Sequence, residues 1–95
     1  MQDEYFEWND EKAERNYRKH NVTFVTARDV FDDSNAIDEQ DESENYGEER
    51  YQAIGRAGGH FLLAVIYTIR NGRIRIISAR RATPRERLRY RESQA

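Results

Sequence analysis

The sequence predicts an α+β domain in which an antiparallel meander of strands is covered by two helices on one face. Three observations lead to this class. Residues 61–70 form an apolar run rich in β-branched side chains, and residues 73–80 alternate after a two-residue break, as the strands of a hairpin do. Asn9 stands as a helix-capping residue before residues 10–20, and Thr23 starts a second helix over residues 23–33. Residues 84–92 follow a helix-start signature, so the expected order is β-α-α-β-β-β-α.

The hairpin is the part of the structure that the sequence predicts in most detail. Asn71-Gly72 tolerates positive φ at both positions, which predicts a type I′ turn and thereby fixes the register. The expected pairs are Arg70 with Arg73, Ile69 with Ile74, Tyr67 with Ile76, and Val65 with Ser78. The expected core face consists of Leu63, Val65, Tyr67, Ile69, Ile74 and Ile76. The opposite face includes Ala79 and four arginines: Arg70, Arg73, Arg75 and Arg81. Arg80 alternates towards the core face, although at the strand end either face is accessible.

Capping residues and apolar spacing define the helices. Asn9 is expected to cap the helix over residues 10–20, with Asn21 just after its end. Thr23 starts the helix over residues 23–33. Its apolar side chains fall on one face, as core residues do: Phe24, Ala27, Val30 and Phe31. The last helix begins with a capping box and an N-terminal proline, made by Thr83, Pro84 and Glu86.

Strands and an acidic loop complete the prediction. Residues 5–8 alternate weakly and predict an edge strand, residues 50–55 predict a strand before the hairpin, and residues 36–37 suit a short strand. Residues 38–49 carry seven acidic and no basic residues, which predicts a mobile loop. Such a run is usually only solvated, and it lacks EF-hand spacing, so we expect no metal site.

Composition bounds the class of protein. The chain has 95 residues, which suit a single domain over 1–95. It has no cysteine, so it has neither a disulfide framework nor a thiolate metal site, and a reducing, cytoplasmic compartment is expected. No apolar run approaches the about 18 residues of a membrane span, and the acidic N-terminus does not resemble a signal peptide.

The net charge of −2 hides a strong asymmetry. Residues 1–50 carry a net charge of −10, whereas residues 51–95 carry +8, and all ten basic residues of the second half are arginines. Arginine suits bidentate phosphate binding and stacking on bases. The asymmetry indicates a nucleic-acid or acidic-protein partner, or else two halves that neutralise each other within the fold.

Three segments resemble the BrnT family of type II toxin–antitoxin toxins. They are FEWNDEKAERNYRKHNVTFVTARDVF over 6–31, GEERYQAIGR over 47–56, and RIRIISARRATPRERLRYRE over 73–92, of which Ile-Ser-Ala-Arg-Arg-Ala-Thr is the most specific part. They follow one another in order and span residues 6–92, almost the whole chain. The sequence departs from the family at Asn21, where glycine is usual, and at Glu44-Asn45, where a histidine-serine pair is more common.

The resemblance implies a RelE-like fold and an RNA-cleaving toxin that works without a cofactor. It also implies a BrnA-type ribbon-helix-helix antitoxin, with the pair repressing its own operon and the toxin meeting operator DNA only through the antitoxin. We expect a heterotetramer with two copies of each chain. Inhibition of translation by RNA cleavage follows from the same likeness.

Metal-free RNA cleavage needs a base for the 2′-hydroxyl, a cation for the phosphorane and an acid for the leaving oxygen. His20 lies in a matching motif and is the better of two histidines, because His60 sits in a glycine-rich turn. Arg80 and Arg81 end a strand beside a helix N-terminus, a good place for phosphate. The expected catalytic residues are His20, Arg50, Arg80, Arg81 and Glu86, and the expected RNA-binding residues are Lys19, Arg73, Arg75 and Arg85.

Several alternatives remain open at this point. His20 also suits a helix-dipole cap, and the capping box explains Glu86 as well as a general base does. A non-catalytic binding module would use the basic sheet face to dock an acidic protein or nucleic acid. A metal-dependent hydrolase would use the acidic loop and would lose its activity in EDTA.

Overall fold

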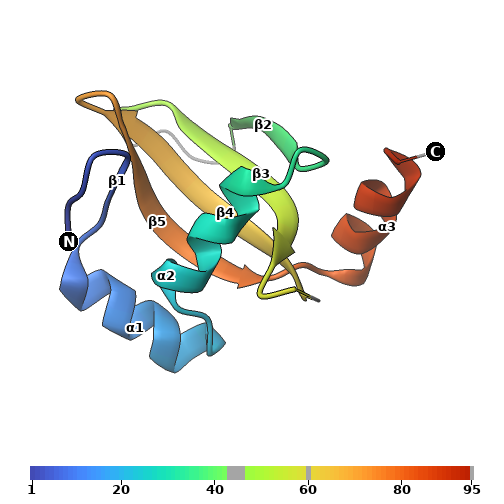
Figure 1. Cartoon of the computed structure of the whole chain (residues 1–95), viewed down its shortest axis with the longest axis horizontal. Helices are drawn as coiled ribbons and strands as arrows, with labels where there is room; N and C mark the ends of the chain where they lie inside the picture. The colour runs from blue at the N-terminus through green and yellow to red at the C-terminus, as the bar shows by residue number, and fades with distance from the viewer. Residues whose placement is uncertain (43–46, 60, 95) are drawn as a thin grey trace.

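A computed structural model describes residues 1–42, 47–59 and 61–94. Its centre is a five-stranded sheet with the order β1-β5-β4-β3-β2 (Figure 1). The strands are β1 (Phe6–Glu7), β2 (Ile37–Asp41), β3 (Arg50–Ala57), β4 (Phe61–Arg70) and β5 (Arg73–Arg81). β1 runs parallel to β5, and the other neighbours are antiparallel, so the sheet is mixed. The α+β class is confirmed. The short strand expected at residues 36–37 is the longer strand β2, and β1 adds a parallel edge to the otherwise antiparallel sheet.

The α-helices begin where the capping residues predict, and α1 also ends where Asn21 predicts. The helices are α1 (Asp10–His20), α2 (Phe24–Ala27), the 3₁₀ helix η1 (Arg28–Asp32) and α3 (Pro84–Glu92). The Asn9 side chain accepts a hydrogen bond from the Lys12 N–H at 3.0 Å. Asn21 ends α1 in the left-handed region with a φ of 57°. α3 has the predicted capping box.

The helix predicted over residues 23–33 is wrong in its length and type. Only four residues are α-helical, and the chain then tightens into η1. This segment packs very closely on β3, where a Cβ added to Gly55 would lie 3.0 Å from Val30 Cγ1. The Asp33 carboxylate after η1 accepts the Arg56 N–H at 2.8 Å and the Tyr90 hydroxyl at 2.7 Å. These contacts fix the end of the segment on the sheet, and helical periodicity does not report them.

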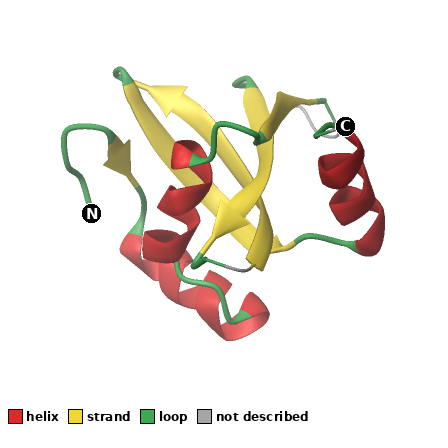
Figure 2. Ribbon diagram, turned by 45° about the vertical axis from the view of Figure 1, so that its right-hand side comes forward, coloured by secondary structure: helices red, strands yellow, loops and turns green. Residues whose placement is uncertain are grey.

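Apolar side chains gather on both faces of the sheet. The main core lies under α1, α2 and η1, which cover one face (Figure 2). It includes Phe24, Val30, Val65 and Ile76, all at most 2 % exposed. A smaller cluster on the opposite face joins α3 to the sheet and consists of Ile54, Ala64, Ala82 and Tyr90. α3 therefore covers only one end of that second face.

The hairpin register is confirmed up to a β-bulge. Arg70, Ile69 and Tyr67 pair with Arg73, Ile74 and Ile76, and the turn residues have positive φ as predicted. The register shifts between Ile66 and Tyr67, and beyond that point the partner of Val65 is Ala79. The predicted Val65–Ser78 pair is therefore wrong.

The bulge reverses the faces of the residues that follow it. Ala79 is fully buried in the helix-covered core instead of lying on the opposite face. Arg80 turns away from α2 and η1 towards the face that α3 covers at one end, and Arg81 turns towards the α1–α2 connection. The core prediction also fails for Ile69, which is 54 % exposed at the turn end of the hairpin.

Part of the predicted acidic loop is a strand. Residues 37–41 pair with residues 50–54 of β3, and the Tyr67 hydroxyl donates to both Asp38 oxygens at 2.7 and 2.8 Å. The pairing with β3 and the Tyr67–Asp38 hydrogen bonds order this segment, although it contains few apolar side chains. The expectation of a loop is wrong for residues 38–41. Glu44-Asn45 and His60 lie outside the described residues.

Candidate active site

The sheet face turned away from α1 and α2 is called the open face. Its residues alternate with core residues on β3, β4 and β5. Its polar members include Arg50, Gln52, Thr68, Arg75, Ser78 and Arg80. Arg75 lies directly opposite Thr68, and Arg80 lies opposite Ala64. The register thus places Arg50 of β3 on the same surface as Arg75 and Arg80 of β5.

Arg80 and Glu86 form the best-defined polar pair on this face. Arg80 Nη1 donates to Glu86 Oε1 at 2.7 Å, and Nη2 donates to Oε2 at 3.0 Å. Glu86 Oε1 also accepts the Thr83 N–H at 2.9 Å, and Gln52 Nε2 lies 3.4 Å from Oε2. The capping box of α3 therefore holds the carboxylate, and the carboxylate holds the guanidinium in a fixed bidentate geometry.

The charge of Glu86 is set by this arrangement. Hydrogen bonds from Arg80 lower the pKa of Glu86 to about 2, against the opposing effect of burial. Such a carboxylate stays ionised near pH 7 and takes up a proton weakly. The capping and positioning roles of Glu86 are therefore better supported than the general-base role.

Two further open-face arginines have carboxylate partners. Arg75 Nη1 donates to Glu7 Oε2 at 2.8 Å, and the Glu7 side chain is only 13 % exposed. Arg50 lies 3.6 Å from Glu48, which also contacts Arg70 at 3.2 Å. These pairs hold the two guanidinium groups in place on the open face.

His20 and Lys19 reach the open face from the end of α1. With Ile77 and Ser78 they line a hollow of about 230 Å³ beside β5. Burial lowers the pKa of His20 below its usual 6.5, and the positive charges of Lys19 and Arg80 lower it further. The imidazole is thus neutral at pH 7 and able to accept a proton.

Asn16 fixes α1 against the edge of β5. Its Nδ2 donates to Ala79 O at 2.8 Å and to Val22 O at 3.0 Å, and its Oδ1 accepts the Ala79 N–H at 3.1 Å. The side chain is buried and replaces a missing neighbouring strand. This contact sets the distance of His20 from β5.

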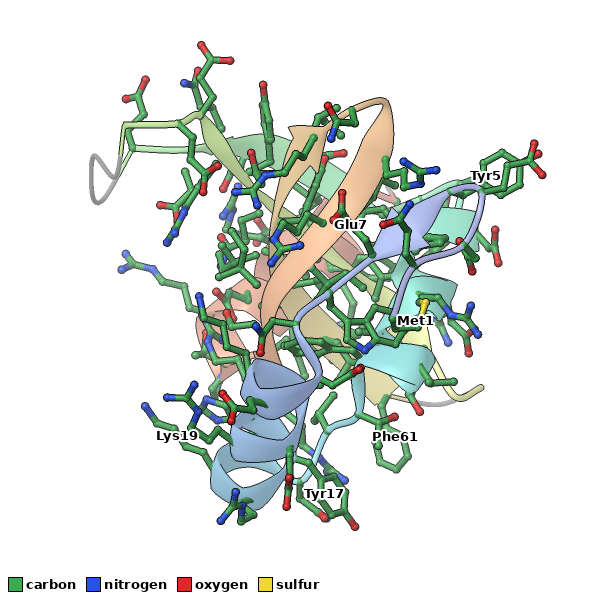
Figure 3. The ribbon with its side chains drawn as sticks, turned by 90° about the vertical axis from the view of Figure 1, so that its left-hand side faces the viewer. Met1, Tyr5, Glu7, Tyr17, Lys19 and Phe61 are labelled. Carbon is green, nitrogen blue, oxygen red and sulfur yellow. The ribbon has the colours of Figure 1, made fainter. Side chains whose placement is uncertain are left out.

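The structure separates the other predicted site residues. Arg81 lies on the helix-covered side, where its guanidinium stacks 4.3 Å from the Phe61 ring. Placing it with Arg73 and Arg75 was wrong, because the bulge reverses its face. Lys19 and Phe61 accordingly lie on opposite sides of the ribbon in Figure 3. Arg73 donates to Asp3 O at 2.7 Å near the hairpin turn, and Arg85 is exposed on α3.

Sequence reasoning missed Glu7, Gln52 and Asn16. Glu7 meets Arg75 only because β1 pairs in parallel with β5, a long-range contact without a local signal. Gln52 reaches Glu86 only because β3 places it on the open face, a contact between residues far apart in the sequence. The sequence held one indication of the role of Asn16. It lies three residues after Ala13, on the face of α1 that packs against the core, so its polar side chain needs a buried partner.

Neither a metal-ion cluster nor a membrane-spanning helix occurs in the described ranges. Among residues 1–42, 47–59 and 61–94, no group of three or more histidine, cysteine or acidic side chains is arranged to hold a metal ion. Within the same ranges, no helix has the length and apolar character needed to cross a membrane.

Comparisons with known proteins place this geometry in a family. A crystal structure of the Brucella abortus ribonuclease toxin BrnT superposes with a TM-score of 0.67 at 24% identity, covering 84% of this chain and 99% of that one. The likeness shows a shared fold. The comparison with curated proteins found no match. Residues 8–86 match the family described as the ribonuclease toxin BrnT of type II toxin–antitoxin systems. The chain therefore belongs to the BrnT family of ribonuclease toxins.

Proposed function

We propose that this chain is an endoribonuclease that cleaves RNA on the open face without a metal ion. The observation that carries the proposal is the bidentate Arg80–Glu86 pair at the end of β5, close enough to His20 to lower its pKa. A fixed cation beside a neutral imidazole suits phosphate chemistry that starts with removal of a proton. The BrnT family membership supports the same activity.

The reaction begins when the 2′-hydroxyl of the RNA attacks the adjacent phosphorus. His20 takes the hydroxyl proton as the new P–O2′ bond forms. The bond from phosphorus to the 5′-oxygen then breaks, and that oxygen takes a proton from a water molecule. This water takes the proton held by His20 in exchange, so the imidazole returns to its neutral form. The products are a 2′,3′-cyclic phosphate and a 5′-hydroxyl, and no oxidant or second substrate is consumed.

The arginines stabilise the charge that develops on the phosphoryl oxygens. Arg80 is preorganised by Glu86, so it needs little reorganisation in the transition state. Arg75 and Arg50 lie further along the same face and contact neighbouring phosphates, together with Lys19 at the end of α1. Arg73 and Arg85 extend this basic surface at its two ends. Phosphate contacts of this kind position RNA without reading its sequence.

The biological consequence proposed here is inhibition of translation through loss of RNA. A toxin of a type II system has a cognate antitoxin. We propose a BrnA-type ribbon-helix-helix protein that binds two copies of the toxin with two of its own. In this arrangement the antitoxin alone contacts operator DNA.

The test is cleavage of a mixed-sequence single-stranded RNA by the purified toxin in EDTA. The wild type is expected to give 2′,3′-cyclic phosphate ends, and Arg80→Ala is expected to cleave about 10²–10³-fold more slowly. Arg18→Ala is the matched control, because Arg18 is exposed on α1 and pairs only with Glu14 among the described residues. Loss of cleavage in EDTA would favour the metal-dependent alternative. RNA binding without cleavage under any condition would favour a binding module.

A further inference from the structure

We propose that an antitoxin segment with an apolar side chain next to a carboxylate docks in a groove on the helix-covered side. This docking groove has a volume of about 330 Å³ and lies between the α1–α2 connection and the ends of β4 and β5. It is lined by Val22, Thr23, Thr26, Phe61, Leu63 and Arg81. The inference rests on the antitoxin partner of the proposed function, and it does not depend on the cleavage mechanism.

The groove offers an apolar surface that the fold leaves uncovered. Phe61 is 45 % exposed, although it begins a strand that is otherwise largely buried. Val22 and Leu63 form the buried floor beside it. A single large apolar side chain fits this hollow and removes the Phe61 ring from water, which is the usual character of an interface anchor.

Charge complementarity identifies the other part of the partner. Arg81 stacks on Phe61 at 4.3 Å, and no carboxylate among the described residues pairs with it. By contrast, Arg75 and Arg80 on the open face already have carboxylate partners within the chain. An incoming carboxylate therefore gains a partner at Arg81 without breaking an internal ion pair.

Other occupants fit the groove less well. RNA would expose its phosphates to one cation beside an apolar hollow, whereas the open face presents several cations. A two-fold contact of this groove with itself would bring two Arg81 guanidinium groups together, and like charges repel. An apolar and acidic protein segment satisfies both features of the groove.

The position of the groove explains how docking there would stop cleavage. Arg80 and Arg81 are neighbours that point to opposite faces at the end of β5. Arg80 Nη1 also donates to Arg81 O at 3.2 Å, so the two sites share backbone. A segment anchored at Arg81 has only to pass around the strand end to cover Arg80 and Glu86.

The experiment measures the dissociation constant between the toxin and the antitoxin, which is the protein encoded beside the toxin gene. The two proteins are co-expressed and then purified. Phe61→Ser and Arg81→Glu are each expected to raise the dissociation constant by about 30-fold or more, as substitutions of interface hot spots do. Tyr5→Ser is the matched control, because Tyr5 is 66 % exposed and lies at the opposite end of the molecule (Figure 3). Unchanged unfolding temperatures confirm that the variants fold.

RNA cleavage provides the second readout. Phe61→Ser is expected to cleave RNA at the wild-type rate while escaping inhibition by the antitoxin. Binding of both groove variants within twofold of the wild type would overturn the proposal. A toxin homodimer that Phe61→Ser dissociates would also overturn it, because the groove would then join two copies. If the wild type cleaves no RNA but antitoxin binding still depends on Phe61, the proposed function fails and the docking groove stands.

Discussion

At the scale of residues, the protonation of Glu86 couples the stability of the fold to the geometry of Arg80. The pKa of Glu86 falls from 4.5 in an unfolded chain to about 2 in the fold. Stabilisation by its ionised form is therefore complete above about pH 4.5 and is lost as the pH falls towards 2. Glu86→Gln is expected to lower the free energy of unfolding at pH 7 and to have little effect near pH 2. Urea unfolding across this range measures the difference, and a difference independent of pH would contradict the coupling.

His20 gives a prediction about the pH dependence of cleavage. Burial and the charges of Lys19 and Arg80 lower its pKa below 6.5, and a base acts in its neutral form. The cleavage rate is expected to rise with pH through a value below 6.5 and to be constant near pH 7. His20→Asn is expected to remove this rising limb and to slow cleavage about 10²–10⁴-fold. An unchanged pH profile in the variant would remove His20 from the mechanism.

At the scale of elements, Asn16 joins α1 to β5. Asn16→Ala would leave the buried N–H and C=O of Ala79 without their side-chain partner, which costs about 1–3 kcal/mol for each such group. We expect a loss of stability of at least about 1 kcal/mol in chemical denaturation. Tyr17→Ala, at an exposed neighbour, is expected to change the stability by about 0.5 kcal/mol or less. Equal stability of the two variants would show that the contact does not hold the helix.

Capping residues and the hairpin turn were sufficient to predict most element boundaries. Asn9, Thr23 and Thr83 act locally, so their hydrogen bonds can be inferred from a few neighbouring residues. The bulge near Ile77 was not predictable in this way, because alternation looks the same on both sides of it. That one irregularity exchanged the faces of Arg80 and Arg81, which are two of the nine expected site residues.

At the scale of the whole molecule, the two oppositely charged halves meet in the fold. Glu7 pairs with Arg75, Glu39 with Arg89, and Glu48 with Arg70. Part of the charge asymmetry is thus neutralised internally, as the simpler interpretation of the sequence held. The family resemblance was also readable from sequence and is confirmed over residues 8–86. The parallel β1–β5 pair and the position of α3 depend on contacts too distant in sequence to predict.

The basic open face predicts a strong dependence of RNA binding on salt. Each phosphate that is neutralised on single-stranded RNA contributes about −0.7 to the slope of log K against log salt concentration. Arg75→Ala is expected to make this slope shallower by about 0.7, and Arg18→Ala to leave it unchanged. Fluorescence anisotropy with a labelled single-stranded RNA measures the slope. Equal slopes for the wild type and Arg75→Ala would show that Arg75 does not contact phosphate.

The most direct test of the central claim compares two adjacent arginines that the bulge places on opposite faces. Single-turnover RNA cleavage is measured in EDTA for the wild type, Arg80→Ala and Arg81→Ala, without antitoxin. If RNA is cleaved on the open face, Arg80→Ala lowers the cleavage rate by about 10²–10³-fold and Arg81→Ala keeps the wild-type rate. A full rate in Arg80→Ala with a loss in Arg81→Ala would place the chemistry on the helix-covered side and contradict the account.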